Sequence, residues 1–440
     1  MRETRLSPRR DPEAALWKNL PRNVTGMLLF EFVWGFGLPF GLYASMVPAY
    51  LTVLGTSKSL MGFVQSFWTI LIPLQLLGGY FFSTRNRMRS VIVLYMLATG
   101  TRWLYDLLTV LVPGMWTQSS LIVFFIVANL SYVGLLLLGQ SLYMGVLTDN
   151  IPVSRRGWIF GLRTLGNGLG GVALGFAASW VLHHWPSATN FRVSFLICDT
   201  FWTLSSLSLF LVRDKPARRR RRGAAAGFFP ALAAKTRVLL SNPNYRIFVF
   251  FQMLNSVALT ITGFIIPYAT ERLKVSDDRV AWLSVIYIAS NVGGVLLGRL
   301  ADKAGYRLVG AVQSLLLVAF YMTAVASRSF AAICAAWTLY SVVNISSGFV
   351  LLNMGLELCP SVGASDLTAL GGTFLLPFVA VATPLAGSII DHTGSYLAVF
   401  FVGVTISIVA LIGFAILVRE PRTGRLYEIR QITQYDTSAR

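Results

Sequence analysis

The chain has 440 residues, of which 55% are hydrophobic and only 12% are charged, and its mean hydropathy is +0.65. Soluble domains carry about 25% charged residues, so this composition excludes an ordinary soluble protein and favours one embedded in a membrane. The formal net charge of +19 would suit a nucleic-acid partner, but the 37 lysines and arginines gather in the tails and in alternate loops. That distribution is typical of the cytoplasmic side of a membrane protein and argues against nucleic-acid binding.

Twelve apolar segments are long enough to cross a bilayer, since a membrane-spanning helix needs about 20 mostly apolar residues. An even number of spans leaves both tails on the same side, and the basic residues of both tails indicate that this side is the cytoplasm. We therefore expect a multi-pass protein of the plasma (inner) membrane whose basic loops contact anionic lipid headgroups. The expected spans are 24–53, 57–82, 89–112, 120–148, 157–182, 193–213, 244–270, 278–301, 307–327, 330–356, 365–388 and 394–418.

The longest polar interruption runs from Arg213 to Arg237 and contains five consecutive arginines, which cannot cross a bilayer. Sliding the second half of the sequence onto the first aligns Pro267 with Pro48 and Gly298 with Gly79, which indicates a duplication. The predicted fold is an all-α integral membrane protein with twelve transmembrane helices in two pseudo-symmetric six-helix bundles. Its expected parts are a cytoplasmic N-tail 1–23, an N-terminal bundle 24–213, a basic cytoplasmic linker 214–243, a C-terminal bundle 244–418 and a cytoplasmic C-tail 419–440.

A motif joins the eighth and ninth expected spans: Gly298 and Asp302 stand four apart, and Lys303, Gly305 and Arg307 follow. This pattern resembles the signature loop of the major facilitator superfamily. The resemblance covers residues 24–418, and it implies two bundles that rock about a central site and open to each side of the membrane in turn.

Two loops of the first half also resemble this family. The loop after the second span keeps Gly79 and Arg87 but has Ser83 where the family has aspartate, and the loop after the fourth span contains Asp149, Arg155 and Arg156. The resemblance implies that Asp302 lies beneath the cytoplasmic end of a neighbouring span, near its positive helix dipole, with Arg155 and Arg156 as candidate partners. We expect this contact in the state whose cytoplasmic side is closed. The expected gating residues are Gly298, Asp302, Lys303, Gly305, Arg307, Gly79, Arg87, Asp149, Arg155 and Arg156.

Five ionisable residues fall well inside the expected spans, and all of them lie in the first half: Glu31, Arg102, Asp106, Arg163 and Asp199. Such residues are costly in a bilayer and are usually paired or functional, so all five are candidates for ion coupling. Arg102 shares a helical face with Asp106 and lies level with Asp199, which favours a structural ion pair between the third and sixth spans. Glu31 and Arg163 lie at similar depths, and two roles stay open for them: a permanent pair, or a carboxyl group that loads and releases a proton.

The spans of the second half offer mainly neutral polar side chains. Together with the aromatic residues, these amides suit an uncharged or amphipathic organic solute better than a small inorganic ion. The candidates for contact with such a substrate are Trp34, Tyr43, Gln140, Tyr143, Gln252, Asn255, Tyr268, Asn291, Trp337 and Asn344.

These features favour a monomeric secondary active transporter that moves a small organic solute by alternating access, with protons as the candidate coupling ion. A proton-driven multidrug exporter and a transporter-shaped receptor without flux are the alternatives. A membrane enzyme would need convergent catalytic groups, and an ATP-driven pump would need a G-x-x-x-x-G-K-[ST] segment; the sequence has neither. Because the three cysteines and three histidines show no ligand spacing, we expect no metal, no cofactor and no enzymatic activity.

Overall fold

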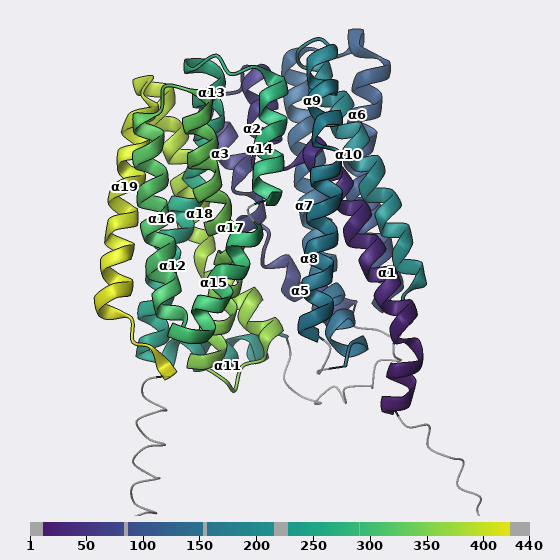
Figure 1. Cartoon of the computed structure of the whole chain (residues 1–440), viewed down its shortest axis with the longest axis vertical. Coiled ribbons are helices and arrows are strands. Elements are labelled where there is room, and N and C mark those ends of the chain that lie inside the picture. The colour runs from purple at the N-terminus through teal and green to yellow at the C-terminus, as the bar shows by residue number, and fades with distance from the viewer. Residues whose placement is uncertain (1–11, 83–86, 153–155, 215–227, 290, 423–440) are drawn as a thin grey trace, which may run out of the picture.

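The computed structural model describes residues 12–82, 87–152, 156–214, 228–289 and 291–422, and its regular elements are helices. Most of them run along the long axis of the molecule. The start of the first helix and the end of the described chain lie at the same end of the molecule, on opposite sides at the bottom of the view (Figure 1). We call this end of the molecule the tail end and the opposite end the far end.

The first half of the chain forms one group of helices, in which α1 packs against α8 and α10, and α6 packs against α7 and α10. Its elements are α1 Pro12–Gly41, α2 Met46–Val53, α3 Lys58–Gln65, α4 Phe67–Ile70, α5 Leu74–Phe81, α6 Arg87–Leu111, the short 3-10 helix η1 Pro113–Met115, α7 Gln118–Asn150, α8 Arg156–Ala173, α9 Gly175–His184, α10 Thr189–Ser208 and η3 Leu209–Leu211.

The second half repeats this packing, because α16 lies against α17 and α19 just as α6 lies against α7 and α10. The two similar bundles that the duplication predicts are therefore present in the fold. The elements of the second half are α11 Phe228–Ser241, α12 Pro243–Ile261, η4 Thr262–Phe264, α13 Ile265–Arg272, α14 Asp277–Ala289, α15 Asn291–Ala304, α16 Tyr306–Ala326, α17 Phe330–Leu358, α18 Ala364–Thr393, α19 Tyr396–Ile412 and the π-helical turn η5 Gly413–Leu417.

Eleven stretches of the described residues are long and apolar enough to cross a membrane. The second expected span, 57–82, is not among them because the chain divides it into α3, α4 and α5. Pro73 precedes α5 and has no amide hydrogen to continue a helix. With this broken segment included, the twelve predicted spans are accounted for.

Side chains at the helix starts explain several of the boundaries. Four capping side chains each accept a hydrogen bond from the backbone amide three residues further along the chain: Ser57, Thr117, Ser329 and Ser395. This bond satisfies an amide of the first turn, which has no acceptor within its own helix. At the other end of α18, Gly394 has φ +66°, a left-handed conformation that glycine adopts without strain. The serines and threonines therefore determine where these spans begin.

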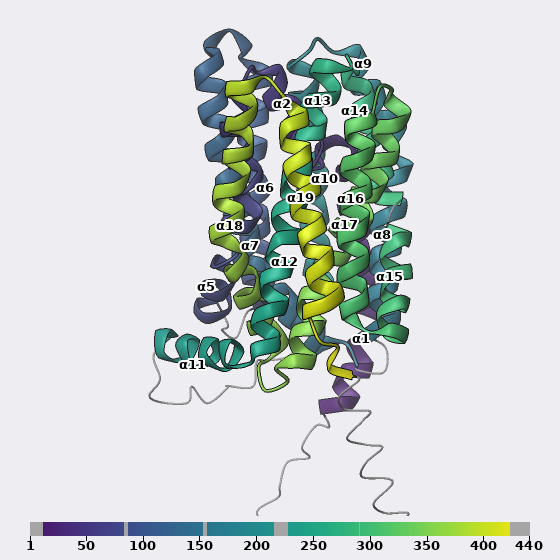
Figure 2. The ribbon, with the colours of Figure 1, turned by 90° about the vertical axis from the view of Figure 1, so that its left-hand side faces the viewer.

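The expected linker contains one further helix, α11, which lies across the tail end of the second half (Figure 2). Leu239 of this helix is fully buried, and Lys235 forms an ion pair of 2.6 Å with Asp366 of α18. The five consecutive arginines of the linker lie outside the described residues. The end of the linker is thus attached to the second bundle.

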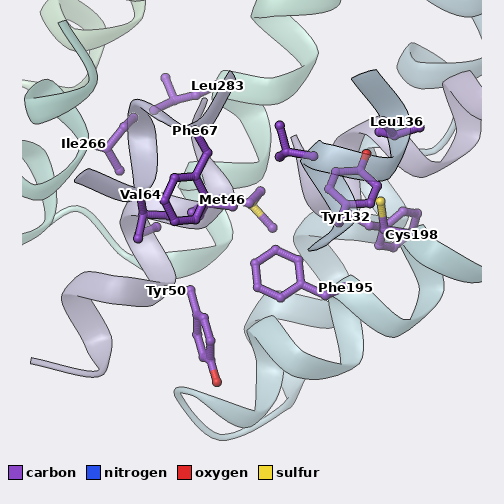
Figure 3. Close-up of a cluster of buried hydrophobic side chains, with 14 of the residues drawn as sticks. Met46, Tyr50, Val64, Phe67, Tyr132, Leu136, Phe195, Cys198, Ile266 and Leu283 are labelled. Carbon is purple, nitrogen blue, oxygen red and sulfur yellow. The ribbon is translucent and has the colours of Figure 1, made fainter. Parts of the chain in front are cut away.

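One large buried cluster crosses from the first half to the second (Figure 3). Met46, Val64 and Phe67 of the first half belong to it together with Ile266 and Leu283 of the second, and all are fully buried. Contacts between the halves are made mainly by α3 with α18 and by α9 with α14. The two bundles therefore share a packed apolar interface.

We predict that Gly78→Ala lowers stability, because a Cβ at this position would overlap the backbone carbonyl of Leu138 where α5 crosses α7. The expected loss is about 1–3 kcal/mol. Gly100→Ala is the matched control: a Cβ there meets nothing within 4 Å, so the better helix propensity of alanine should raise stability by up to about 1 kcal/mol. Thermal unfolding of the purified variants in detergent, followed by circular dichroism, measures both effects. Equal unfolding temperatures for the two variants would contradict the close approach.

Candidate functional site

The far end carries a group of polar contacts between the halves. The carboxylate of Asp391, in the last turns of α18, accepts hydrogen bonds from the backbone amides of Lys58 (2.8 Å) and Ser59 (2.9 Å) and from the Ser59 hydroxyl (2.6 Å). These amides begin α3, where the helix dipole favours an anion. A carboxylate from the second half therefore caps a helix of the first half.

Four more polar contacts lie at the far end. Lys58 forms an ion pair with Glu271 across the halves, and Tyr396 of the second half supports Glu271 by donating a hydrogen bond to it (2.6 Å). Asp277 accepts hydrogen bonds from Ser187 (3.1 Å) and from Asn190 (3.0 Å). We call these contacts, together with the Asp391 cap, the far-end clasp; its residues are Lys58, Ser59, Ser187, Asn190, Glu271, Asp277, Asp391 and Tyr396.

Close backbone packing accompanies the clasp. A Cβ on Gly62 would overlap the carbonyl of Thr383, and a Cβ on Gly387 would overlap that of Lys58, so α3 and α18 touch without intervening side chains. Deeper in the interface, the hydroxyls of Ser45 and Ser284 are 2.8 Å apart and both residues are fully buried. The far end is therefore a closed interface between the halves.

Among the described residues, the ion pairs at the tail end each join segments of one half. In the first half, Arg87 binds Asp149 at 2.7 Å and Asp214 at 2.9 Å. In the second half, Arg422 binds Glu357 at 2.6 Å. These contacts stabilise each bundle separately.

The residues of the signature loop lie at this tail end. Gly305 has φ +86°, which favours glycine, and its Cβ would overlap the Glu420 carboxylate, which also accepts a hydrogen bond from the Arg307 amide (3.0 Å). Arg422 donates to the carbonyls of Ala301 and Asp302, so the last described residues cover the end of α15.

Some of the remaining gating candidates are exposed, and others lie outside the described residues. The side chains of Asp302 and Lys303 are exposed, and a Cβ on Gly298 would meet nothing within 4 Å. Gly79 lies in α5. Ser83, Arg155 and the side chain of Arg156 lie outside the described residues. The expected pairing of Asp302 with these arginines stays a prediction, for a state with a closed tail end.

Glu31 and Arg163 form an ion pair between α1 and α8, and both side chains are mostly buried. Arg163 also lies 3.2 Å from the Tyr143 hydroxyl, and Asn167 donates a hydrogen bond to the Glu31 carboxylate at 3.4 Å. The pair contains one acid and one base, so its charges balance.

Arg102 of α6 and Asp199 of α10 form the second buried pair of the first half, with Nε and Oδ2 3.2 Å apart. Their predicted ion pair is therefore present. Asp106 lies one turn further along α6 and is equally buried. The guanidinium group is enclosed by the rings of Tyr132, Phe195 and Trp202, whose centroids lie 4.9–5.5 Å from its central carbon.

Several substrate candidates make hydrogen bonds between helices through neutral groups. Gln140 accepts from the Tyr95 hydroxyl (3.0 Å), Gln252 donates to Ser347 (3.2 Å), and Asn344 donates to the Tyr287 hydroxyl (2.8 Å). The side chains of Gln140, Tyr287 and Asn344 are only partly buried. These three side chains are therefore not completely enclosed by the protein.

Other candidates have their polar atoms bound within the packing of their own half. The indole of Trp337 donates to the carbonyl of Leu283 (2.7 Å), and Asn255 accepts from Ser314 (2.9 Å). The side chain of Asn291 lies outside the described residues. Tyr43 donates to the carbonyl of Val64, and Tyr268 donates to that of Ser327. The ring of Trp34 stacks on that of Trp202, with centroids 4.5 Å apart.

Sequence reasoning missed the far-end clasp. A signal was available, because Lys58 stands at the outer end of one expected span while the acids Glu271 and Asp391 stand at the outer ends of two others, so opposite charges lie at the same level. Nothing in the sequence connects them, since Lys58 and Asp391 are 333 residues apart. Among the described residues, no group of three or more His, Cys, Asp or Glu side chains could bind a metal ion.

Solved structures similar to this one cover nearly the whole chain. A variant of the nucleoside transporter NupG is 14% identical, with a TM-score of 0.66 over 91% of this chain and 100% of the other. The xylose transporter XylE from E. coli is 13% identical, with a TM-score of 0.65 over 92% and 98%. A variant of the E. coli fucose:proton symporter FucP is 15% identical, with a TM-score of 0.57 over 90% and 98%. At these identities the likeness shows a shared fold.

A search of curated proteins finds no match to the sequence. The model of the Major Facilitator Superfamily matches residues 107–359, which is more than half of the chain and includes the fourth-span loop and the signature loop. The two six-helix bundles, the motif between α15 and α16 and this match agree, and the protein belongs to the Major Facilitator Superfamily.

Proposed function

We propose that the protein is a secondary active transporter that moves a small, polar, uncharged organic solute across the plasma membrane by alternating access. The observation that carries this proposal is the uneven distribution of contacts between the halves. The clasp and the close packing of α3 on α18 join the halves at the far end, whereas the tail-end ion pairs in the described part of the chain each lie within one half. Two bundles joined at one end only are what a rocking transporter requires in one of its states.

The tail end is cytoplasmic in this proposal, because the basic residues of both tails favour that side. The structure then corresponds to the state that opens toward the cytoplasm. In the other state the clasp is broken, and the signature loop with Asp302 joins the halves at the tail end. Each state is stabilised by polar contacts that the other state lacks.

Two observations support the proposed class of solute. Partly buried amides and hydroxyls, such as Asn344, Tyr287 and Gln140, offer donors and acceptors that suit a polyhydroxylated molecule. The structures of similar fold include transporters of a nucleoside, of xylose and of fucose. Proton coupling is part of the proposal, since the fucose protein is described as a proton symporter.

Uptake into liposomes tests the function directly. We expect purified, reconstituted protein to accumulate a radiolabelled pentose, hexose or nucleoside above the level of protein-free liposomes, and a pH gradient to increase the accumulation of the transported solute. If none of the three classes enters faster than in protein-free liposomes, but one of them stabilises the purified protein thermally, the receptor alternative replaces the transporter.

The clasp leads to a second prediction. Asp391→Asn removes the negative charge at the start of α3 and one of its acceptors, so it should destabilise the far-end contact by about 1 kcal/mol and increase opening of the far end about fivefold. The reporter is Ser284→Cys, at the buried Ser45 contact, in a protein whose native cysteines are replaced. The rate of maleimide labelling measures the opening.

Asp278→Asn is the matched control, because it removes a carboxylate at the same end that makes no ion pair across the halves within the described part of the chain. Its labelling rate should equal that of the parent. Equal rates for all three proteins would contradict the assignment of the clasp as the contact that closes the far end.

The solute contact leads to a third prediction. Asn344→Ala removes a donor and leaves the Tyr287 hydroxyl without this partner, so KM should rise about tenfold, which corresponds to roughly 1.4 kcal/mol. Thr338→Val on the same helix is the control, since its exposed hydroxyl bonds only to its own helix in the described structure. Transport kinetics measure both variants, and an unchanged KM in Asn344→Ala would remove this residue from the solute site.

A further inference from the structure

The helix α11 is attached to the second half along one face. Leu239 belongs to a buried cluster of that half, Leu232 packs against the cluster, and Lys235 forms an ion pair of 2.6 Å with Asp366 of α18. Leu232, Lys235 and Leu239 follow the spacing of a single helical face. The attachment therefore determines which sides of α11 are left exposed.

Large apolar side chains lie on these exposed sides. Phe229 is 77% exposed, Val238 43% and Leu240 42%. By the helical period of 3.6 residues, Phe229 and Leu240 lie on one side of the attached face, and Val238 lies on its other side. Arg237 and Ser241 lie opposite the attached face, and both are exposed. The surface of α11 is therefore apolar at its flanks and polar on the side that points away from the bundle.

The position of α11 brings these flanks to the level where the spans end. Figure 2 shows the helix lying across the spans at the tail end, with its first turns projecting sideways beyond them. A helix that runs parallel to the membrane surface at this level lies at the boundary between lipid headgroups and acyl chains. Phe229 lies in the first of these turns, at the depth where a bilayer offers apolar contact.

Exposed arginines lie at the same end of the second half. Arg237 belongs to α11, Arg246 to the first turn of α12, and Arg419 follows η5. Asn244 connects α12 to the end of η5, because its side chain exchanges hydrogen bonds of 2.7 and 2.9 Å with the backbone of Arg419. None of the three arginines forms an ion pair with a described residue. Their positive charges are therefore available to an anion.

We propose that α11, the start of α12 and the end of η5 form a binding surface for anionic lipid at the tail end of the second half. Phe229 and Leu240 insert among the acyl chains, and Arg237, Arg246 and Arg419 bind the headgroup phosphates. A guanidinium group suits this ligand, because it donates paired hydrogen bonds to phosphate oxygens. The surface does not depend on the transport proposed above.

The charge of the surface favours lipid over a second copy of the chain as its occupant. Two copies that met through this surface about a two-fold axis would place the arginines of one against those of the other. Anionic lipid instead neutralises the arginines, and each arginine near such a membrane surface strengthens binding about fivefold. One partner, an anionic leaflet, therefore satisfies both the apolar flanks and the positive charges.

A fluorescent label on α11 tests the contact with lipid. In protein whose native cysteines are replaced, Leu240→Cys carries a bimane label, and the protein is reconstituted in liposomes of phosphatidylcholine and phosphatidylglycerol. We expect brominated lipid to quench this label more strongly than the water-soluble quencher iodide does. Ser241→Cys, on the neighbouring polar side of the helix, is the matched control, and there iodide should quench more strongly than brominated lipid.

The same label tests the arginines. Bromine is placed either on phosphatidylglycerol or on phosphatidylcholine, so the ratio of the two quenching efficiencies measures which lipid occupies the surface. We expect the labelled Leu240→Cys protein to prefer phosphatidylglycerol, and the further change Arg246→Gln to reduce this preference about fivefold. Arg279→Gln, which removes an exposed arginine at the far end, is the control that should keep the preference.

Several outcomes overturn the proposal. Equal quenching by iodide at Leu240→Cys and Ser241→Cys means that both sides of α11 lie in water. A label on Leu240→Cys that neither quencher reaches means that protein, such as a second copy of the chain, covers the surface. Equal quenching by the two brominated lipids, or an unchanged preference in Arg246→Gln, overturns the assignment of the arginines to lipid phosphates.

Discussion

The contact between α3 and α18 constrains how the two halves lie relative to each other. At one end of this contact the Asp391 carboxylate binds the start of α3, which is a strong and directional interaction. Along the rest of the contact, Gly62 and Gly387 let the two backbones touch. Such a contact has one register, because any shift along either helix brings a side chain or a carbonyl into overlap. It therefore joins the halves firmly in this structure, and the alternating access that we propose requires its loss in the other state.

The buried polar side chains of the two halves have different kinds of partner. In the first half they form ion pairs: Arg163 joins α8 to α1, and Arg102 joins α6 to α10. The second half uses neutral hydrogen bonds, such as Gln313 to Ser346 at 2.7 Å and Ser314 to Asn255 at 2.9 Å. Charges inside a membrane protein bind the proton or restrict the packing, whereas neutral amides suit an uncharged solute.

Parts of the candidate site were predictable because they depend on depth in a span. Counting residues from the span ends placed Arg102 level with Asp199 and Glu31 level with Arg163, and both pairs are present. The third acid, Asp106, was visible on the same helical face as Arg102, and it is equally buried. The breaks in the second span were not predicted, since hydropathy alone does not show where a helix is interrupted.

The sequence by itself determined the apolar spans, the duplicated halves and the signature loop, because hydropathy, helical periodicity and glycine positions depend on a residue and its near neighbours. Only the tertiary structure decided that Lys58 meets Glu271 and Asp391, that α11 lies across the second bundle, and that the halves are joined at the far end. These contacts depend on how two packed bundles are positioned relative to each other. One sequence permits more than one such position, so the pattern of residues along the chain does not select between them.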